Sequence, residues 1–495
     1  MSTVAQALPA SIATIAKDNT QDNTPASAAE VYRALSHGAP AGADRAMART
    51  FLEQQLKQAR ALRSDLPGDV AEMEDWINDR GEAIGGEYNA YLQQRREGAP
   101  RRYFTTKAHA LFFLKHVAPT KLVDGAWLYG VLERWDDPDF RPLIQTYLEE
   151  LGDGVPDKNH VVLYKKLLAS NGCDQWQDVG ETHLVQGAIQ LALGYDAEHF
   201  LPEIIGFNLG YEQLPLHLLI TAYELNELGI DPYYFTLHIT VDNGGTGHAF
   251  KAVQALQQLL PRCGDASAFL RRVNDGYRLN DLGAGTTSVI AEFDLETELM
   301  RIMAAKSVVG KNMHSDYCRV GGRSINDWLA DARQIPAMLA ALETAGWIQR
   351  GQPADNSRFW RLIQSERAEM FGVFSAYEQQ ILSDWIATKP GEPVAPAART
   401  PSFRARQRAL DTLGLHHSPR SGAARGIIRH HADNNAVSAN DSGGVDQLRQ
   451  LELQVASMGN KQAAMRLLHS LMTPANHHTA SGLMATRLFG QLMNQ

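Results

Sequence analysis

Cysteine is scarce in this chain, and its scarcity narrows the classes of protein to consider. The 495 residues contain three cysteines, Cys173, Cys263 and Cys318, which lie far apart and show no CxxC spacing. This usage gives no sign of a cysteine zinc site or of a disulfide framework. It is typical of a protein in a reducing compartment, and we expect a cytoplasmic location.

Long apolar runs and an excess of basic residues are also missing. No stretch reaches the roughly 18 uninterrupted apolar residues of a membrane span, and no basic start followed by an apolar run opens the sequence. Lys and Arg number 47 against 56 Asp and Glu, for a net charge of -9. This balance argues against nucleic acid or an anionic membrane as the main partner. We therefore expect a soluble protein that has neither nucleic acid nor a membrane as its partner.

Helical periodicity dominates the pattern that is present. Apolar residues recur at intervals of three and four over residues 46–64 and 69–96, and the same spacing continues through most of the chain up to residue 260. A long helix is expected from Pro202 towards Leu228, with a kink at Pro215. Because no convincing alternating run occurs before residue 340, the main body is predicted to be all-α.

Shifts in composition divide the chain into five predicted segments. Residues 1–45 are rich in small and polar side chains, and residues 391–445 are rich in Pro, Ala, Ser and Arg, so neither stretch is expected to order by burial. The predicted segments are a flexible leader (1–45), a helical domain with a metal site (46–300), an accessory segment (301–390), a disordered linker (391–445) and C-terminal helices (446–495).

The accessory segment has a local pattern of its own. A predicted helix from Ile335 is followed by a tight turn at Ala345 and Gly346, and then by short apolar stretches that include the one starting at Ser357. This order resembles a small winged-helix-like unit. Together with the Arg-rich linker, it leaves a regulatory or nucleic-acid-binding helical protein as an alternative, which the acidic total charge disfavours.

The stretch from Leu201 to Phe250 has the highest density of groups that can carry chemistry. Carboxylates and imidazoles set among large apolar side chains are buried only when they are paired, hydrogen-bonded or bound to a metal. The stretch contains Glu203, Glu212, His217, Glu224, His238, Asp242 and His248. We interpret Glu212, His217 and Glu224 either as groups that orient ligands or as one partly solvated helix face.

Two spacings in this region are compatible with a metal site. His238 and Asp242 are four residues apart, which places them on one face of a helix, although such pairs also occur simply as helix-stabilising contacts. Upstream, Glu150 ends one predicted helix and His160 begins the next, so their side chains can converge on one point. From spacing alone, solvated acids beside a turn and a capping histidine fit this second pair equally well.

Three motifs then point to a family. EELGDGVPDKNH, PEIIGFNLGYE and YFTLHITVDNGGTGH occur in that order within residues 149–248. In an all-helical body they resemble the haem-oxygenase-like di-iron oxidases and oxygenases, also called iron-containing redox enzymes. The resemblance implies a haem-oxygenase-like helical bundle and a non-haem iron-dependent, O2-using oxidoreductase. The metal ligands that it implies are Glu150, His160, Glu203, His238, Asp242 and His248.

The last ligand departs from the family pattern. The family motif His-x-x-x-Asp-x-x-His places a histidine three residues after Asp242, where this sequence has Gly245. His248 is the nearest substitute, and the glycines before it permit the local irregularity that would bring it into place. The resemblance implies two iron ions, the second of them labile, and O2 as co-substrate. A metal-independent haem-oxygenase-like enzyme is the alternative that this departure keeps open.

The reaction is not specified further by the sequence. Members of the resembled family act on amino acids, their derivatives or fatty acids, by N-oxygenation, hydroxylation or carbon-carbon cleavage. Imidazole and carboxylate ligands suit non-haem iron, and the lack of clustered cysteines argues against an iron-sulfur cluster. The sequence identifies no catalytic residue beyond these ligands, and it is compatible with a homodimer.

Overall fold

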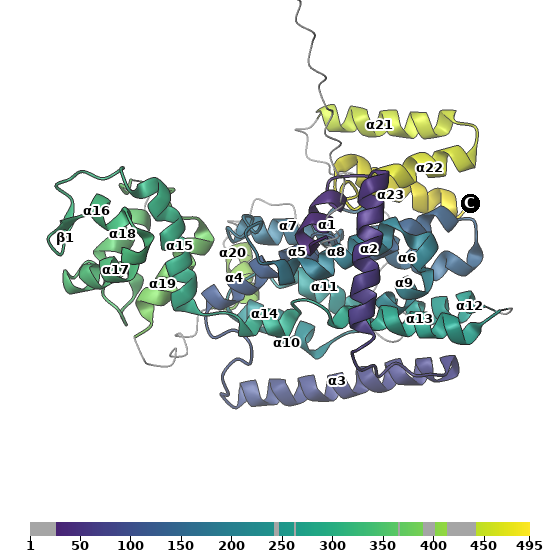
Figure 1. Cartoon of the computed structure of the whole chain (residues 1–495), viewed down its shortest axis with the longest axis horizontal. Helices are drawn as coiled ribbons and strands as arrows, with labels where there is room; N and C mark the ends of the chain where they lie inside the picture. The colour runs from purple at the N-terminus through teal and green to yellow at the C-terminus, as the bar shows by residue number, and fades with distance from the viewer. Residues whose placement is uncertain (1–25, 242–246, 262–263, 365–366, 390–400, 413–441) are drawn as a thin grey trace, which may run out of the picture.

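Helices make up nearly all of the ordered secondary structure in the computed structural model, which describes residues 26–241, 247–261, 264–364, 367–389, 401–412 and 442–495 (Figure 1). The all-α prediction is confirmed. Within these ranges the strands are limited to β1 (Arg319–Val320) and β2 (Arg323–Ser324), which pair antiparallel. No helix in the described ranges combines the length and apolarity that crossing a membrane requires.

The larger of two apolar cores holds the main bundle together. Trp127, Leu193 and Phe207 are fully buried in it, and Met465 and Phe489 join it from near the C-terminal end of the chain. Its helices are α1 (Ala28–Leu35), α2 (Gly42–Ala59), α3 (Met73–Arg96), α6 (Arg141–Glu150), α8 (Glu181–Tyr195), α9 (Ala197–Tyr211), α12 (His248–Leu259), α13 (Ala266–Arg278), α21 (Ser442–Ser457), α22 (Lys461–Leu471) and α23 (Ala480–Met493).

The second core continues from the bundle into a lobe formed by α15 to α19, at the left of Figure 1. Its helices are α4 (Lys107–His116), α5 (Ala118–Lys121), α7 (His160–Ser170), α10 (Leu216–Glu227), α11 (Tyr233–Val241), α14 (Thr286–Ala291), α15 (Leu295–Gly310), α16 (Ile325–Leu329), α17 (Ile335–Thr344), α18 (Arg358–Gln364) and α19 (Ala376–Ala387). The helices α6 and α12 belong to the first core, whereas α7 and α11 belong to the second. Side chains from all four meet at the boundary, and the candidate site lies there.

Two predicted unstructured segments contain helices. Residues 1–25 lie outside the described residues, but α1 falls inside the predicted leader, and its Val31 and Leu35 are fully buried against the bundle. The short apolar face of α1 is enough because it packs against α8. Likewise α20 (Phe403–Thr412) lies inside the predicted linker, where the Arg404 backbone N–H donates to the Asn226 side chain over 3.1 Å.

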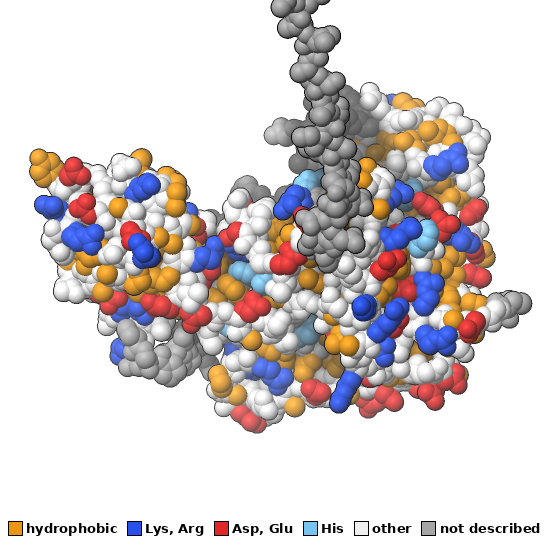
Figure 2. Space-filling view, in the orientation of Figure 1, with side chains coloured by type: hydrophobic (Ala, Val, Ile, Leu, Met, Phe, Trp, Pro, Cys, Tyr) orange, Lys and Arg blue, Asp and Glu red, His pale blue; other side chains and the backbone are white. Residues whose placement is uncertain are grey.

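The predicted winged-helix-like unit has its helix and its turn, but not the strands that would follow them. The predicted helix forms as α17, and Gly346 makes the turn after it with a φ of +72°. The stretch from Ser357 is helical and forms α18, so residues 347–364 supply no strand pair. On the face shown in Figure 2, acidic and basic side chains are interspersed over both the lobe and the bundle.

Glycines allow α9 and α13 to cross with their backbones in contact. A Cβ atom on Gly206 would overlap the Val273 carbonyl, and one on Gly276 would overlap the Glu203 carbonyl. We expect Gly206→Ala to lower the free energy of unfolding by about 3 kcal/mol, since the packed helices must separate. Gly85→Ala is the control, because that helical glycine has open space and alanine stabilises a helix by about 0.5–1 kcal/mol there. Urea denaturation measures both, and equal effects would contradict the close crossing.

Two partly buried histidines make stability sensitive to acid. Burial lowers the pKa of His116 and of His469 to about 4, so both stay neutral in the folded protein at pH values where the unfolded chain protonates them. Folded stability should therefore fall as pH drops from about 6.5 to 5, by up to about 1.4 kcal/mol per pH unit for each histidine. Urea midpoints at pH 7.5, 6 and 5 measure the slope. His469→Gln should flatten it, and an unchanged slope would contradict the assignment.

Candidate metal centre

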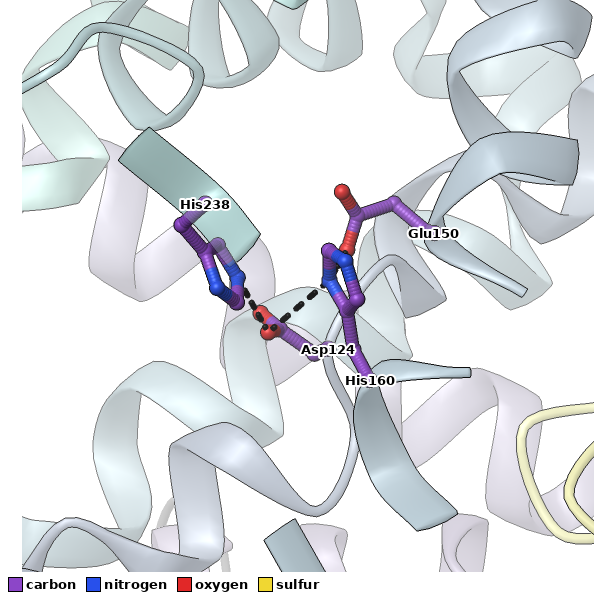
Figure 3. Close-up of side chains that lie close together, drawn as sticks. All are labelled: Asp124, Glu150, His160 and His238. Atoms are coloured by element: carbon purple, nitrogen blue, oxygen red, sulfur yellow. Dashed lines mark hydrogen bonds and ion pairs between the residues drawn. The ribbon is translucent and has the colours of Figure 1, made fainter. Parts of the chain in front are cut away.

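Four buried side chains from four separate elements converge at the boundary between the cores. Asp124, Glu150, His160 and His238 each direct a ligand-type atom into one space, and these atoms all lie within 4.8 Å of one another (Figure 3). The four side chains are almost completely inaccessible to solvent. Such a group of carboxylates and imidazoles needs protons or a metal ion to offset its charge.

A tight loop between α6 and α7 brings Glu150 and His160 together. Glu150 is the last residue of α6 and His160 the first of α7. Gly152 between them has a φ of +65°, and a Cβ atom there would overlap the Asn159 backbone. The loop places Glu150 Oε2 2.6 Å from His160 Nδ1. The predicted convergence of these two side chains is confirmed.

Asp124 is held in place by tyrosines and by a glycine beside it. Its carboxylate accepts hydrogen bonds from the hydroxyls of Tyr211 (2.7 Å) and Tyr234 (2.6 Å). Gly125 has a φ of +81°, and a Cβ atom there would lie 2.9 Å from Glu150 Cβ, so the turn needs glycine to sit this close. Burial raises the pKa of Asp124, but Lys121 and the two imidazoles outweigh burial and hold that pKa well below its usual range.

The imidazole nitrogens that face the centre have the character of ligands. His238 Nδ1 lies 2.9 Å from the Tyr234 carbonyl oxygen, which can only accept, so Nδ1 carries the hydrogen. A neutral His238 therefore presents the lone pair of Nε2 to the Asp124 carboxylate, 3.2 Å away. Two acceptors face each other at hydrogen-bond distance. A bound cation or an added proton must lie between them.

His160 presents the same situation at Glu150. Although His160 Nδ1 and Glu150 Oε2 are close, their angle is not that of a hydrogen bond, and both atoms are buried without a hydrogen-bond partner. Burial lowers the pKa of His160, but the Glu150 and Asp124 carboxylates outweigh burial and raise that pKa to about 10. The carboxylates therefore attract positive charge strongly to this point. A metal ion would replace the proton that they otherwise retain.

A second group of ligand-type side chains shares Glu150 with the first. His248, the first residue of α12, is fully buried, and its Nδ1 lies 2.9 Å from Glu212 Oε2 and 3.3 Å from Glu150 Oε1. Its Nε2 lies 2.9 Å from Glu149 Oε2. Glu150 thus directs one carboxylate oxygen at His160 and the other at His248. The Glu150 carboxylate therefore lies between the two groups of ligand-type side chains.

The comparison with protein families agrees with this chemistry. A family model described as iron-containing redox enzyme matches residues 111–281, a segment that contains both groups of ligand-type side chains. No curated protein and no solved structure matches the chain significantly. The resemblance drawn from the sequence motifs is confirmed over this segment, and the donor atoms present are compatible with iron binding.

The matched segment brings together most of the predicted ligands, but Glu203 lies apart from them. Both carboxylate oxygens of Glu203 accept from the Arg272 guanidinium at 2.7 Å, and Glu203 belongs to neither group. Its role is to tie α9 to α13. Glu150, His160 and His238 lie in the first group, and His248 lies in the second with Glu150. Asp242 lies outside the described residues.

Two residues of the centre were not among the predicted ligands. Glu212, the residue after α9, belongs to the second group. The predicted long helix is two helices, because α9 ends at Tyr211 and Pro215 caps α10 instead of kinking a continuous helix. Asp124 was missed altogether. The available signal was a lone carboxylate in the apolar stretch LVDGAWLYG, which requires a buried partner.

Glu224 has a structural role instead. Its carboxylate accepts hydrogen bonds from the Tyr91 hydroxyl at 2.7 Å and from the Phe104 backbone N–H at 2.9 Å. These contacts fix the chain between α3 and α4 against α10. Glu224 therefore stabilises the fold. It neither orients a proposed ligand nor lies on a partly solvated helix face, which were the two roles expected from the sequence.

Proposed function

We propose that this protein is a non-haem di-iron oxidase or oxygenase that uses O2 to oxidise a small substrate. The observation that carries the proposal is the position of Glu150 between two buried groups of ligand-type side chains. A carboxylate shared in this way is the arrangement that a pair of metal ions requires. The family match to iron-containing redox enzymes supports the choice of metal.

The residues divide between two ions. Asp124, His160 and His238 would hold the first ion together with Glu150, and Glu212 and His248 would hold the second with the same Glu150. Asp242 stays a proposed ligand. Mixed imidazole and carboxylate donors suit non-haem iron, which supplies the activation of O2 when bound. The chain itself supplies a dry enclosure, since each of these six described side chains is buried.

Hydrogen bonds fix the orientation of the ligands before any metal binds. The Tyr234 carbonyl sets the tautomer of His238, while the Tyr211 and Tyr234 hydroxyls orient the Asp124 carboxylate. Lys121 donates to the Tyr211 hydroxyl over 2.9 Å, which extends the network. Such supports maintain ligand geometry and ligand basicity.

A cavity beside the second group suits a small substrate that carries a carboxylate. It has a volume of about 370 Å³, and Glu149, which contacts His248 Nε2, lines it. Arg487 of α23 and Asp153 also line it, and neither is ion-paired within the described parts of the chain. An amino acid or a fatty-acid derivative would place its carboxylate at Arg487 and its reacting part towards the metal centre.

Metal loading tests the proposal. After anaerobic incubation with ferrous iron and desalting, the protein should retain about two iron ions per chain and should then consume O2. His238→Ala should lower the iron content. His199→Ala is the matched control, since that imidazole is exposed on α9 and pairs with Asp196. Negligible iron in the native chain, with no change in His238→Ala, would reject the proposal.

A further inference from the structure

A second cavity, of about 530 Å³, lies between α1, α7, α8 and the segment that follows α22. None of the proposed metal ligands lines it. Its walls include Arg33 and His37 from the region of α1, Lys165 from α7, and His478. The proposed metal site therefore does not account for this cavity.

Every charged residue that lines the cavity is basic. No Asp or Glu is among its lining residues, although the chain as a whole carries a net charge of -9. Arg33 and Lys165 form no ion pair with a carboxylate in the parts of the chain that the structure describes. Positive charge grouped in a concave site without acidic partners favours binding of an anion.

Two of these basic groups face each other directly. Lys165 Nζ lies 2.6 Å from His478 Nε2, so the ammonium donates to a neutral imidazole. Burial lowers the pKa of both groups, and the charge of Lys165 further lowers that of His478, which is about 4. An oxyanion beside this pair would accept a charge-assisted hydrogen bond from one of the remaining N–H groups of Lys165.

The rest of the wall is apolar and aromatic. The rings of Tyr32 and Trp176 pack edge to face with centroids 6.0 Å apart, and Leu122 and Leu184 lie beside them. Apolar walls with a few convergent polar groups are the usual composition of small-molecule sites. A bare inorganic ion would leave this surface unused, so the site fits a ligand with an apolar body.

We propose that this cavity binds a small oxyanion that carries an aromatic or apolar body, an aryl carboxylate or an aryl phosphate. Lys165, His478 and Arg33 hold the anionic head, and Tyr32 with Trp176 packs against the body. The two kinds of head share the same chemistry of recognition. Titration with one anion of each kind distinguishes them.

The cavity lies next to the supports of the metal centre. Val123 lines it and precedes Asp124, and His478 follows His477. The side chains of His477 and Asn159 meet at 3.2 Å (Nδ1 to Nδ2), and Asn159 caps the helix that begins at His160. Binding requires none of the metal ligands. The anion site therefore stands independently of the proposed iron chemistry.

Calorimetric titration of the full chain after chelation of metal tests the proposal. Phenyl phosphate, phenylacetate or both should bind with a Kd below about 1 mM, and the tighter of the two identifies the natural head group. Inorganic phosphate and benzyl alcohol should each bind at least about tenfold more weakly, because one lacks the body and the other the charge. Metal-free protein separates this result from any failure of iron loading.

Variants locate the binding site. Lys165→Gln and Arg33→Gln should each weaken binding of the preferred probe at least about tenfold. Lys166→Gln is the matched control on the same helix, where Lys166 pairs with the exposed Asp157, and it should bind as the native chain does. Circular dichroism verifies that the variants fold. The proposal is overturned if neither aryl anion binds, if benzyl alcohol binds equally well, or if Lys165→Gln and Lys166→Gln behave alike.

Discussion

Glu150→Gln is expected to remove iron from both positions of the centre at once. Its two carboxylate oxygens point to His160 and His248, at 2.6 Å and 3.3 Å. The amide keeps the size of the side chain but loses the negative charge and presents an N–H₂ group to one imidazole. Iron per chain after anaerobic loading should fall from about two to near zero, since each ion loses a shared ligand. Colorimetric iron determination on desalted protein measures the change.

Two further variants make this prediction specific. Glu212→Gln should remove only the ion near His248 and leave about one iron per chain. Glu203→Gln should retain both ions, because Glu203 is bound to Arg272, and should instead lower thermal stability. Iron loss in Glu203→Gln with retention in Glu212→Gln would support the ligand set predicted from the sequence and reject the set that contains Glu212.

Deletion of residues 459–495 is expected to prevent stable folding. The segment contributes Met465, Leu468, Met472 and Phe489 to the larger core, each nearly or fully buried. Burial of such side chains stabilises the fold by about 2 kcal/mol each. The total of about 8 kcal/mol is comparable with the whole stability of a typical domain, about 5–15 kcal/mol. The shortened chain should be insoluble, or should show no cooperative urea transition.

Point variants determine how much of this effect is core packing. Phe489→Ala removes a fully buried ring and should cost about 3–5 kcal/mol. Leu453→Ala on α21 is the matched control, since its side chain is 63% exposed, and it should change stability by less than about 0.5 kcal/mol. A shortened chain with the native urea midpoint would show that α22 and α23 are accessory to the fold.

Local features of the sequence carried the correct predictions. The helical class follows from apolar spacing within each helix, and the meeting of Glu150 with His160 follows from one short glycine-rich loop. Neither prediction depends on how distant parts of the chain pack. The α1 helix was missed because its burial depends on α8, about 150 residues further along the chain.

The errors within the site have the same origin. The hydroxyl of Tyr211 and the side chains of Tyr234 and His238 meet Asp124 across separations of 87, 110 and 114 residues. No local pattern indicates such partners. Glu203 was expected among the ligands because the resemblance to the family implied it, and a continuous helix past Pro215 was a separate prediction. A break there changes which carboxylate faces the centre, and periodicity cannot distinguish a break from a kink.

The contact between Asn159 and His477 joins residues that are 318 positions apart. A ribosome therefore completes every described ligand of the centre, ending with His248, long before it makes the segment that supports the α6–α7 loop. The nascent chain contains the ligand residues before it contains His477, which contacts the α6–α7 loop. If the centre binds iron as proposed, its complete surroundings exist only once the C-terminal segment has been made.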